Sequence, residues 1–402
     1  MIKGDFFFTE VIFYYILYIC TVKMCAMIIE DKIDSLARAG QYEMEGIGFG
    51  KVDQSLPPGV FYASCGGGKY MPLLRILSDN RCKYNCYYCP WRSSIDIERG
   101  YITPDELAKY FFELYQRRIV KGLFLSSAVW KSPDRSMEAI VGTAEILRQK
   151  GFKGYIHLKI IPGSSDSAIE SAVRLASRVS INLEAPSSKR LSLLAPQKKF
   201  DSVLMDTLTR TVKIVEKINE KLRKKVKITT QYVVGPSDES DRELLHTTEL
   251  LYRKTWVHRA YYSPFFIPDP ESPLSNKEPT PWIRVARLYQ ADWLIKHYGF
   301  KVEELPFNDK GNLPLNIDPK LKWALDNPDY FPLEINKAER EELLRVPGLG
   351  PKAVSYILKT RVKERFKFPY QLKPITNRWK TAVNFLLFDG RKYTYPMQLE
   401  LI

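Results

Sequence analysis

The sequence has little cysteine and no long apolar run. Its six cysteines in 402 residues, three of them within eight positions, are too few and too clustered for a disulfide framework. This excludes a disulfide-stapled secreted domain and favours a reducing compartment. The apolar stretch near the N-terminus, Val11–Val22, has twelve residues, whereas a membrane-spanning helix needs about 20. We therefore expect a cytoplasmic protein without stable membrane association.

The first 27 residues resemble a secretory leader only faintly. Lys3 precedes the apolar stretch, but Asp5 and Glu10 spoil the positively charged start that such a leader needs. Met27 follows directly, and a polar, structured chain is expected from there on. We expect residues 1–27 to be a dispensable leader that results from a start codon assigned too early.

Charge is distributed unevenly along the chain. Apolar residues make up 45% and charged residues 27% of the sequence, which is typical of a globular protein and excludes a disordered or collagen-like chain. The net charge of +15 favours an anionic partner, either nucleic acid or a membrane surface. Residues 336–402 carry 14 Lys or Arg against 6 Asp or Glu, so more than half of the excess lies in one sixth of the chain.

Short apolar runs alternate with helix-like segments along the central part of the chain. This alternation predicts βα units around a parallel sheet. Periodicity alone leaves open whether the strands close into a barrel or form an open, doubly wound sheet. The six expected strands are Leu73–Leu77, Leu123–Ser127, Tyr155–Ile160, Val179–Leu183, Ile228–Val234 and Arg259–Phe266.

Three segments carry clear helix signals. Thr103 and Glu106 form a capping box around a proline at the first helical position, and Ser240 and Glu243 predict a second capped helix. Residues 209–227 have one apolar face, and the rest of this expected helix is rich in Lys and Arg. We interpret its basic side as a solvated face rather than a nucleic-acid contact.

Three cysteines follow the first expected strand. Cys82, Cys86 and Cys89 have the spacing C-x3-C-x2-C, and three thiolates on a short loop can bind three corners of an iron–sulfur cubane while its fourth iron has no protein ligand. The alternatives are a zinc site and chance clustering. Structural zinc needs a fourth ligand, but no histidine lies within sixty residues of the loop and Cys65 is seventeen residues before Cys82. The iron–sulfur interpretation is therefore favoured.

With Tyr88 directly before the last cysteine, the motif resembles the CxxxCxxC signature of the radical S-adenosylmethionine (SAM) enzymes. The resemblance implies a [4Fe–4S] cluster on the three cysteines, with SAM bound to the fourth iron. One electron, from a donor such as ferredoxin or flavodoxin, then cleaves SAM to methionine and a 5′-deoxyadenosyl radical. The family's fold, an α/β partial (β/α)6 TIM-like barrel, fits the six expected strand–helix repeats.

The same resemblance assigns SAM-binding positions. It places Tyr88 beside the adenosine. Ser126 and Ser127, followed by Ala128, stand where the family usually has Gly-Gly-Glu, so the small residues are approximated and the acid is missing.

Further positions at strand ends follow from the resemblance. Glu184 matches a polar position that often reaches SAM, and Gln231 and Gly235 match the region that lines the adenosine. Each could equally be an ordinary strand-end polar residue or turn glycine. Lys159 is a candidate catalytic residue, because a lysine that points into a barrel is unusual unless it meets a ligand or a carboxylate. It could instead face the helices and extend its amine to solvent.

The second strong pattern lies in residues 343–353, which resemble a helix-hairpin-helix with a Pro-Gly-apolar-Gly turn. We expect Gly348, Gly350 and Lys352 to bind phosphate, because glycines allow close approach and a following helix directs amides at an anion. Such a hairpin contacts the backbone of DNA without reading its sequence. The alternative is a helical hairpin used for packing or protein contact. Aromatic residues further on could stack on unpaired bases or form a small core: Trp379, Tyr393 and Tyr395.

Taken together, residues 40–365 resemble an uncharacterised radical SAM family linked to DNA modification or repair. The predicted function is therefore SAM cleavage with action on nucleic acid, DNA being the favoured substrate. A tRNA- or protein-modifying radical SAM enzyme is one alternative. A non-enzymatic DNA-binding iron–sulfur protein is another.

Composition and motifs together divide the chain into consecutive segments. Residues 269–281 and 308–332 are rich in Pro, Asn or Asp, which indicates loops or linkers. The expected order is a leader (1–27), an N-terminal extension (28–70), the radical SAM barrel (71–300), a linker (301–335), the helix-hairpin-helix (336–365) and a basic tail (366–402).

Overall fold

The computed structural model describes residues 31–40, 56–66, 69–223, 225–255 and 257–396. The described residues form two compact units, one within Met1–Asn182 and Ala195–Thr230 and the other within Leu183–Leu194 and Gln231–Ile402. The expected leader, residues 1–27, lies outside the described residues.

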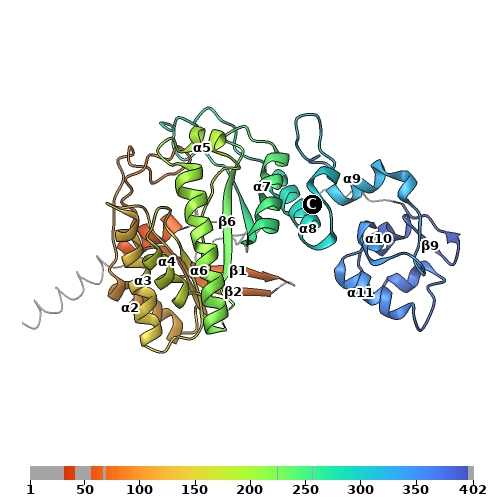
Figure 1. Cartoon of the computed structure of the whole chain (residues 1–402), viewed down its shortest axis with the longest axis horizontal. Coiled ribbons are helices and arrows are strands. Elements are labelled where there is room, and N and C mark those ends of the chain that lie inside the picture. Colours follow the sequence, from red (N-terminus) through yellow and green to blue (C-terminus); the bar gives the residue numbers. More distant parts are fainter. Residues whose placement is uncertain (1–30, 41–55, 67–68, 224, 256, 397–402) are drawn as a thin grey trace, which may run out of the picture. The chain divides into compact units, whose positions relative to one another are not determined.

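Among the described residues, the main sheet has seven strands in sequence order. Figure 1 labels three of them, β1, β2 and β6. Its first pair is antiparallel, and each further pair from β2 to β6 is parallel, as successive βα units require. The curled sheet confirms the expected α/β partial barrel. Its strands are β1 (Val60–Gly66), β2 (Lys69–Leu77), β3 (Gly122–Ser126), β4 (Tyr155–Lys159), β5 (Arg178–Ser180), β6 (Lys227–Val234) and β7 (Val257–Pro264).

All six expected strands are present, and β1 is an additional strand. It lies in the segment expected to be an N-terminal extension and pairs with β2 from Val60↔Leu74 to Gly66↔Lys69, with an irregularity between Ser64 and Gly66. Its short, glycine-ended sequence gives no periodic signal of its own. It is a strand because the edge of β2 offers unpaired backbone groups.

Helices of the first unit pack in a row, α2 on α3, α3 on α4 and α4 on α6. Strand β3 is buried along its whole length, so it needs cover on both faces. The predicted capping box of α2 is confirmed, with Thr103 accepting from the Glu106 amide and Glu106 from the Thr103 amide. The four helices are α2 (Pro104–Gln116), α3 (Pro133–Gln149), α4 (Asp166–Leu175) and α6 (Asp206–Leu222).

Helix α6 corresponds to the basic helix expected at residues 209–227. It is preceded by a π-helical turn, Phe200–Met205, and ends at Arg223, which has a left-handed backbone. Lys213 and Lys217 lie on its exposed side, as a solvated face requires.

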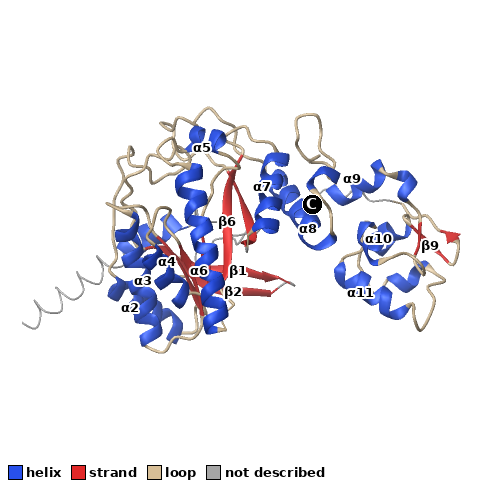
Figure 2. Cartoon of the chain, in the orientation of Figure 1, coloured by secondary structure: helices blue, strands red, loops and turns tan. Residues whose placement is uncertain are grey.

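The second unit contains β7 and the C-terminal helices, in which Figure 2 shows helices joined by long loops. Its helices are α5 (Ser188–Leu194), α7 (Asp241–Lys254), α8 (Trp282–Tyr298), α9 (Pro319–Asp326), α10 (Arg340–Arg345), α11 (Pro351–Thr360) and α12 (Trp379–Val383). The capping box of α7 is confirmed at Ser240 and Glu243. A small second sheet has β9 (Leu386–Phe388) at its centre, between β10 (Arg391–Lys392) and β8 (Leu333–Glu334).

Two C-terminal segments are more ordered than their composition indicates. Helix α9 lies within residues 308–332, where we expect loops, because Asp318 caps it and Pro319 occupies its first turn. The same Asp-Pro pair that signals a loop also starts a helix. Residues 366–396, part of the expected basic tail, contribute the buried side chains of Leu372 and Phe388. In the part of the chain that the structure describes, no helix has both the length and the apolar character needed to cross a membrane.

Candidate functional site

The three cysteines lie on the loop that follows β2. Cys86 is buried, while Cys82 and Cys89 are partly buried, and none of the three is in a disulfide. A turn closes between them, because the Cys89 amide donates to the Cys86 carbonyl at 2.9 Å. The loop therefore gathers the three sulfurs on one short segment at the carboxyl end of a parallel strand, where α/β barrels place their sites.

The environment of the sulfurs fits a metal cluster. The Tyr84 amide donates to Cys82 Sγ and the Trp91 amide to Cys89 Sγ, each at 3.4 Å, and such donors favour thiolates. Burial first, and then the charges of Cys86 and Cys82, raise the pKa of the Cys89 thiol. Because burial and the charges of Cys86 and Cys82 oppose the ionisation of Cys89, the loop is suited to a group that brings positive charge.

A single arginine holds the shape of the cysteine loop. The Arg99 guanidinium donates to four backbone carbonyls, those of Asn80 at 2.9 Å, Trp91 at 2.8 Å, Arg92 at 2.7 Å and Ile95 at 3.0 Å. The sequence gives no signal for this residue, because backbone acceptors leave no side-chain pattern. Arg99 is therefore a positioning residue that sequence reasoning missed.

Residues after α5 also support the loop. The Asn85 amide donates to Gln197 Oε1 at 2.8 Å, and Lys198 Nζ donates to the Tyr88 hydroxyl at 3.2 Å. Tyr88 is thus held at its hydroxyl end. Its expected place beside an adenosine stays a prediction.

Ser126 and Ser127 lie at the carboxyl end of β3, beside the start of the cysteine loop. Both are buried; the Ser126 carbonyl accepts from the Ser78 amide at 2.9 Å, and Ser127 Oγ donates to the Ala128 carbonyl at 2.9 Å. The two serines therefore lie at the strand edge where the family resemblance places them, and their contact with SAM stays a prediction.

Lys159 ends β4 and is buried, with 6% of its surface exposed. Its amine donates to Asn182 Oδ1 at 2.7 Å, so it does not extend to solvent as one interpretation allows. The amine lies instead at the carboxyl ends of β4 and β5, in the first unit. A catalytic role for it stays a prediction.

Glu184, in the second unit, has an unusual backbone. Its φ of 66° is left-handed, which is rare for a residue with a long side chain, and it is 5% exposed. Its amide donates to the Gln231 carbonyl at 2.9 Å, and its carbonyl accepts from Val233 at 2.8 Å. Such strain is kept where the surrounding structure fixes it, often at functional positions.

Gln231 and Gly235 belong to β6 and the turn after it. Gln231 Nε2 donates to Ser263 Oγ on β7 at 2.8 Å. Gly235 has φ of 111°, and a Cβ there would lie 2.2 Å from Thr280 Oγ1. Close packing against Thr280 is thus reason enough for this glycine, and its expected contact with adenosine stays a prediction.

Two helices joined by a tight turn occupy the expected hairpin. Gly348 in this turn has φ of 84°, and a Cβ there would lie 2.7 Å from the Arg378 carbonyl. Gly350 caps α11, and Lys352 is exposed in the first turn of that helix. Gly348 is thus needed for packing within the chain, and phosphate binding by the turn stays a prediction.

The aromatic residues of the tail divide into two kinds. Trp379 packs edge-on against Tyr395 at 5.1 Å, and Tyr393 against Phe388 at 5.9 Å, which favours the small-core interpretation of these rings. Phe368 and Tyr370, by contrast, are 40% and 62% exposed and stack in parallel at 5.5 Å.

Among the described residues, no three His, Cys, Asp or Glu side chains form a group that could hold a single metal ion. A cubane takes one cysteine sulfur per iron and so does not need three ligands around one ion. The donor set of the cysteine loop is therefore compatible with a cluster.

Comparison with solved structures gives distant similarities. The [FeFe]-hydrogenase maturase HydG from Carboxydothermus hydrogenoformans is 13% identical, with 55% of this chain and 50% of that chain covered and a TM-score of 0.44. Methylornithine synthase (PylB) is 14% identical, with 54% and 61% covered and a TM-score of 0.41. The cobalamin-dependent radical SAM enzyme OxsB is 13% identical, with 74% and 50% covered and a TM-score of 0.33. The chain thus spans half to three-fifths of their lengths, and TM-scores below 0.5 do not establish a fold or function.

No curated protein matches the chain by sequence, whereas one family model does. The model of the radical SAM superfamily matches residues 76–251, which run from the end of β2 through the cysteine loop to α7. Members of this family use a [4Fe–4S] cluster and SAM. Residues 76–251 therefore form a domain of the radical SAM superfamily, a family of enzymes.

Proposed function

We propose that the chain reductively cleaves SAM and acts on nucleic acid, with DNA as the favoured substrate. The observation that carries the first part is the three-cysteine loop, in which burial and the neighbouring cysteines oppose the ionisation of Cys89, and which lies within the residues that match the radical SAM model. When bound, the cluster supplies the electron that breaks the sulfonium bond of SAM. An electron donor, such as ferredoxin or flavodoxin, and a cytoplasmic location belong to the same proposal.

The residues of the loop have distinct roles in this proposal. Cys82, Cys86 and Cys89 would hold the cluster, and the amides of Tyr84 and Trp91 donate to two of the sulfurs. Hydrogen bonds from these amides withdraw electron density from the sulfurs, which would make the bound cluster easier to reduce.

The test is SAM turnover without oxygen. Reconstituted protein with dithionite is expected to form 5′-deoxyadenosine and methionine, and Cys86→Ala is expected to lose this activity because one iron has no ligand. Cys65→Ala is the matched control, since Cys65 is an exposed cysteine outside the loop. Turnover by Cys86→Ala at the unaltered rate would refute the ligand assignment. Purified protein that contains zinc or no metal would overturn the mechanism.

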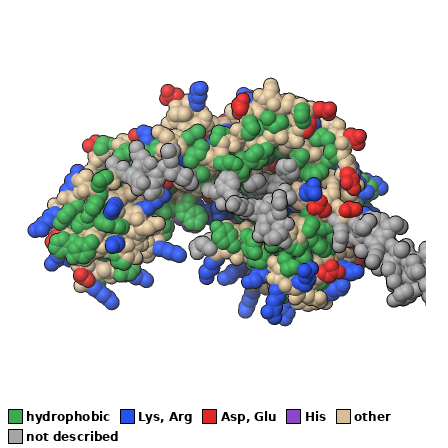
Figure 3. All heavy atoms as spheres, turned by 180° about the vertical axis from the view of Figure 1, so that it is seen from behind, with side chains coloured by type: hydrophobic (Ala, Val, Ile, Leu, Met, Phe, Trp, Pro, Cys, Tyr) green, Lys and Arg blue, Asp and Glu red, His purple; other side chains and the backbone are tan. Residues whose placement is uncertain are grey.

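The nucleic-acid part of the proposal is supported by the C-terminal surface. Helix α11 exposes Lys352, Tyr356 and Lys359, which are spaced four and three residues apart and so share one face. Figure 3 shows Lys and Arg side chains projecting around the rim of the C-terminal part, with apolar patches among them. A basic face interleaved with exposed rings fits phosphate and base contacts.

Salt dependence tests this part. Affinities for duplex DNA, single-stranded DNA and tRNA, measured at several salt concentrations, are expected to give a steep log–log slope for the preferred substrate. Lys352→Gln with Lys359→Gln should flatten the slope by about 0.7 to 0.9 for each phosphate that the chain no longer neutralises. Lys213→Gln with Lys217→Gln, on the exposed side of α6, is the matched control and should leave the slope unchanged.

The exposed aromatic pair separates strand types in the same experiment. Phe368→Ala with Tyr370→Ala should weaken single-strand binding by roughly 1–3 kcal/mol per base without changing the slope. Preference for tRNA would move the proposal to the tRNA-modifying alternative. Absence of any salt-dependent binding would remove nucleic acid as the substrate and leave a protein-modifying enzyme.

A further inference from the structure

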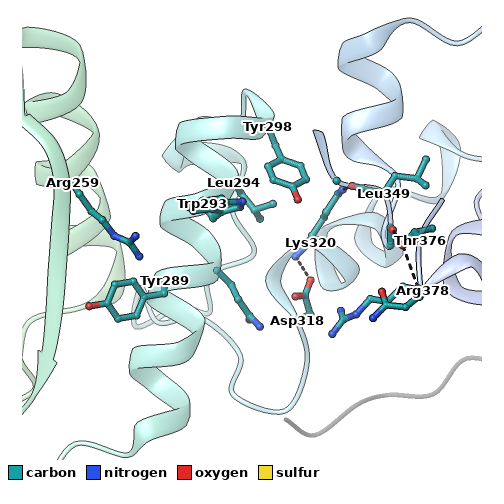
Figure 4. Close-up of a pocket in the computed structure, with 14 residues that line it drawn as sticks. Arg259, Tyr289, Trp293, Leu294, Tyr298, Asp318, Lys320, Leu349, Thr376 and Arg378 are labelled. Carbon is teal, nitrogen blue, oxygen red and sulfur yellow. Dashed lines mark hydrogen bonds between the residues drawn. The ribbon is translucent and has the colours of Figure 1, made fainter. Parts of the chain in front are cut away.

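A pocket of about 400 Å³ lies within the second unit, beside the turn between α10 and α11 (Figure 4). Its wall is formed by α8, the start of α9, the turn at Gly348–Gly350 and residues 376–378. This volume lies in the range of small-molecule sites, which is roughly 300–1,000 Å³.

Cations outnumber anions on the pocket wall. Arg259 extends from β7 toward α8, while Lys320 and Arg378 approach from the C-terminal segments (Figure 4). The carboxylate on the wall is that of Asp318, and one of its oxygens already caps α9 by accepting from the amides of Lys320 and Leu321 at 2.9 and 3.1 Å. The wall therefore presents a surplus of positive charge to the space it encloses.

Two of these cations have unused donors. Lys320 is 6% exposed, and its ammonium makes one hydrogen bond, to the Leu349 carbonyl at 2.7 Å, although it carries three N–H groups. It also lies 4.5 Å from the centre of the Tyr298 ring. Among the described residues, Arg259 Nε is buried without a hydrogen-bond partner. Buried polar groups almost always find partners, so unused donors on a cavity wall indicate an acceptor-bearing ligand.

The positive charge of Lys320 is costly because the side chain is buried. Burial is the main cause that lowers the pKa of Lys320 to about 7, and Arg345 lowers it further, while Asp318 opposes the shift. An anion beside the ammonium would offset this cost.

We propose that this pocket binds the phosphate group of a nucleotide, with Lys320 as its buried charged partner and with Arg259 and Arg378 adding positive charge from the wall. The surplus of cations suits a phosphate better than a neutral ligand. An arginine guanidinium can also form bidentate hydrogen bonds with two phosphate oxygens. The remaining volume has aromatic walls, Trp293 and Tyr298, against which a base and sugar fit. The phosphate belongs either to a free mononucleotide or to the end of a nucleic-acid strand. The proposal does not depend on SAM cleavage.

Calorimetric titration of the full chain tests the pocket. Thymidine 5′-monophosphate, thymidine and inorganic phosphate are the probes, because a thymine base avoids the expected adenosine site. The monophosphate is expected to bind and thymidine to bind at least tenfold more weakly. An oligonucleotide with and without a 5′-phosphate distinguishes a strand end from a free nucleotide.

Variants connect binding to the named residues. Lys320→Met should weaken monophosphate binding roughly tenfold to a hundredfold, as expected for a lost hydrogen bond to a charged group. Arg378→Gln changes an exposed residue and should weaken binding without altering the fold. Lys322→Met is the matched control on the same helix, where Lys322 pairs with Asp326, and should bind as the unaltered chain does.

The outcomes are separable from those of the proposed function. Equal binding of thymidine and its monophosphate, or unchanged binding in both pocket variants, would overturn the phosphate site. Monophosphate binding that needs Lys320 and Arg378 supports the site even if the chain binds no nucleic acid. In that case the nucleic-acid proposal fails and the pocket belongs to a nucleotide.

Discussion

At the residue scale, Arg99 makes a sharper prediction than any residue found from the sequence. Its guanidinium donates to four carbonyls on both sides of the cysteine loop. Arg99→Met leaves those acceptors without a donor, so we expect the unfolding free energy to fall by at least about 2 kcal/mol. We also expect the reconstituted protein to hold less iron, because the loop that presents Cys82, Cys86 and Cys89 loses its shape.

Iron and sulfide content and the electron paramagnetic resonance spectrum with SAM check this prediction, since a merely stabilising residue would change neither. Arg135→Met is the control, because Arg135 pairs with Glu138 on an exposed helix surface. Arg99→Lys should restore the loop only in part, since an ammonium cannot reach four acceptors in the planar fork of a guanidinium. Full iron content and an unaltered spectrum in Arg99→Met would remove its positioning role.

The same residues show what a sequence can tell about a site. The cysteines can be found because their ligand chemistry depends on a short spacing within one loop. Arg99 cannot, because its partners are backbone carbonyls that any residue supplies. Gly235 is a third case. We expect this glycine beside a ligand, but the close packing of Thr280 already explains why no larger residue fits there.

At the element scale, the sequence predicts what depends on local periodicity and capping. The six expected strands and the capped helices α2 and α7 are present because the information for each lies within a few residues. Strand β1 forms because it pairs with the edge of β2, and this pairing leaves no pattern in the sequence of β1 itself. Helix α9 cannot be predicted in the same way, because Asp318 and Pro319 are equally good in loops.

The composition also does not predict how the aromatic rings pack or which of them are exposed. Trp379 and Tyr393 are as aromatic and as close to basic residues as Phe368 and Tyr370. The first two pack edge-on within the chain, and the second two are exposed as a parallel pair. Because packing decides which rings are available to a base, Phe368 and Tyr370 are the more exposed candidates for stacking, and stacking by Trp379, Tyr393 and Tyr395 stays a prediction.

At the scale of the whole molecule, the buried lysine makes stability depend on pH. Burial lowers the pKa of Lys320 to about 7, whereas the ordinary value is 10.5. Between these values the unfolded chain holds a proton that the folded chain has lost, so the unfolding free energy rises with pH. This contribution is complete above pH 10.5 and is lost as the pH falls to about 7.

Denaturant unfolding at about pH 7, 8 and 9 measures this slope. One group with this shift contributes at most about 1.4 kcal/mol per pH unit. Lys320→Met should remove that contribution, whereas Lys322→Met should keep it because Lys322 is partly exposed beside Asp326. A saturating phosphate ligand should also reduce the slope in the unaltered chain, because an anion beside the ammonium raises its pKa toward the unfolded value. If the slope is the same in both lysine variants, the ammonium of Lys320 is not held in the buried position that both the pocket and this dependence require.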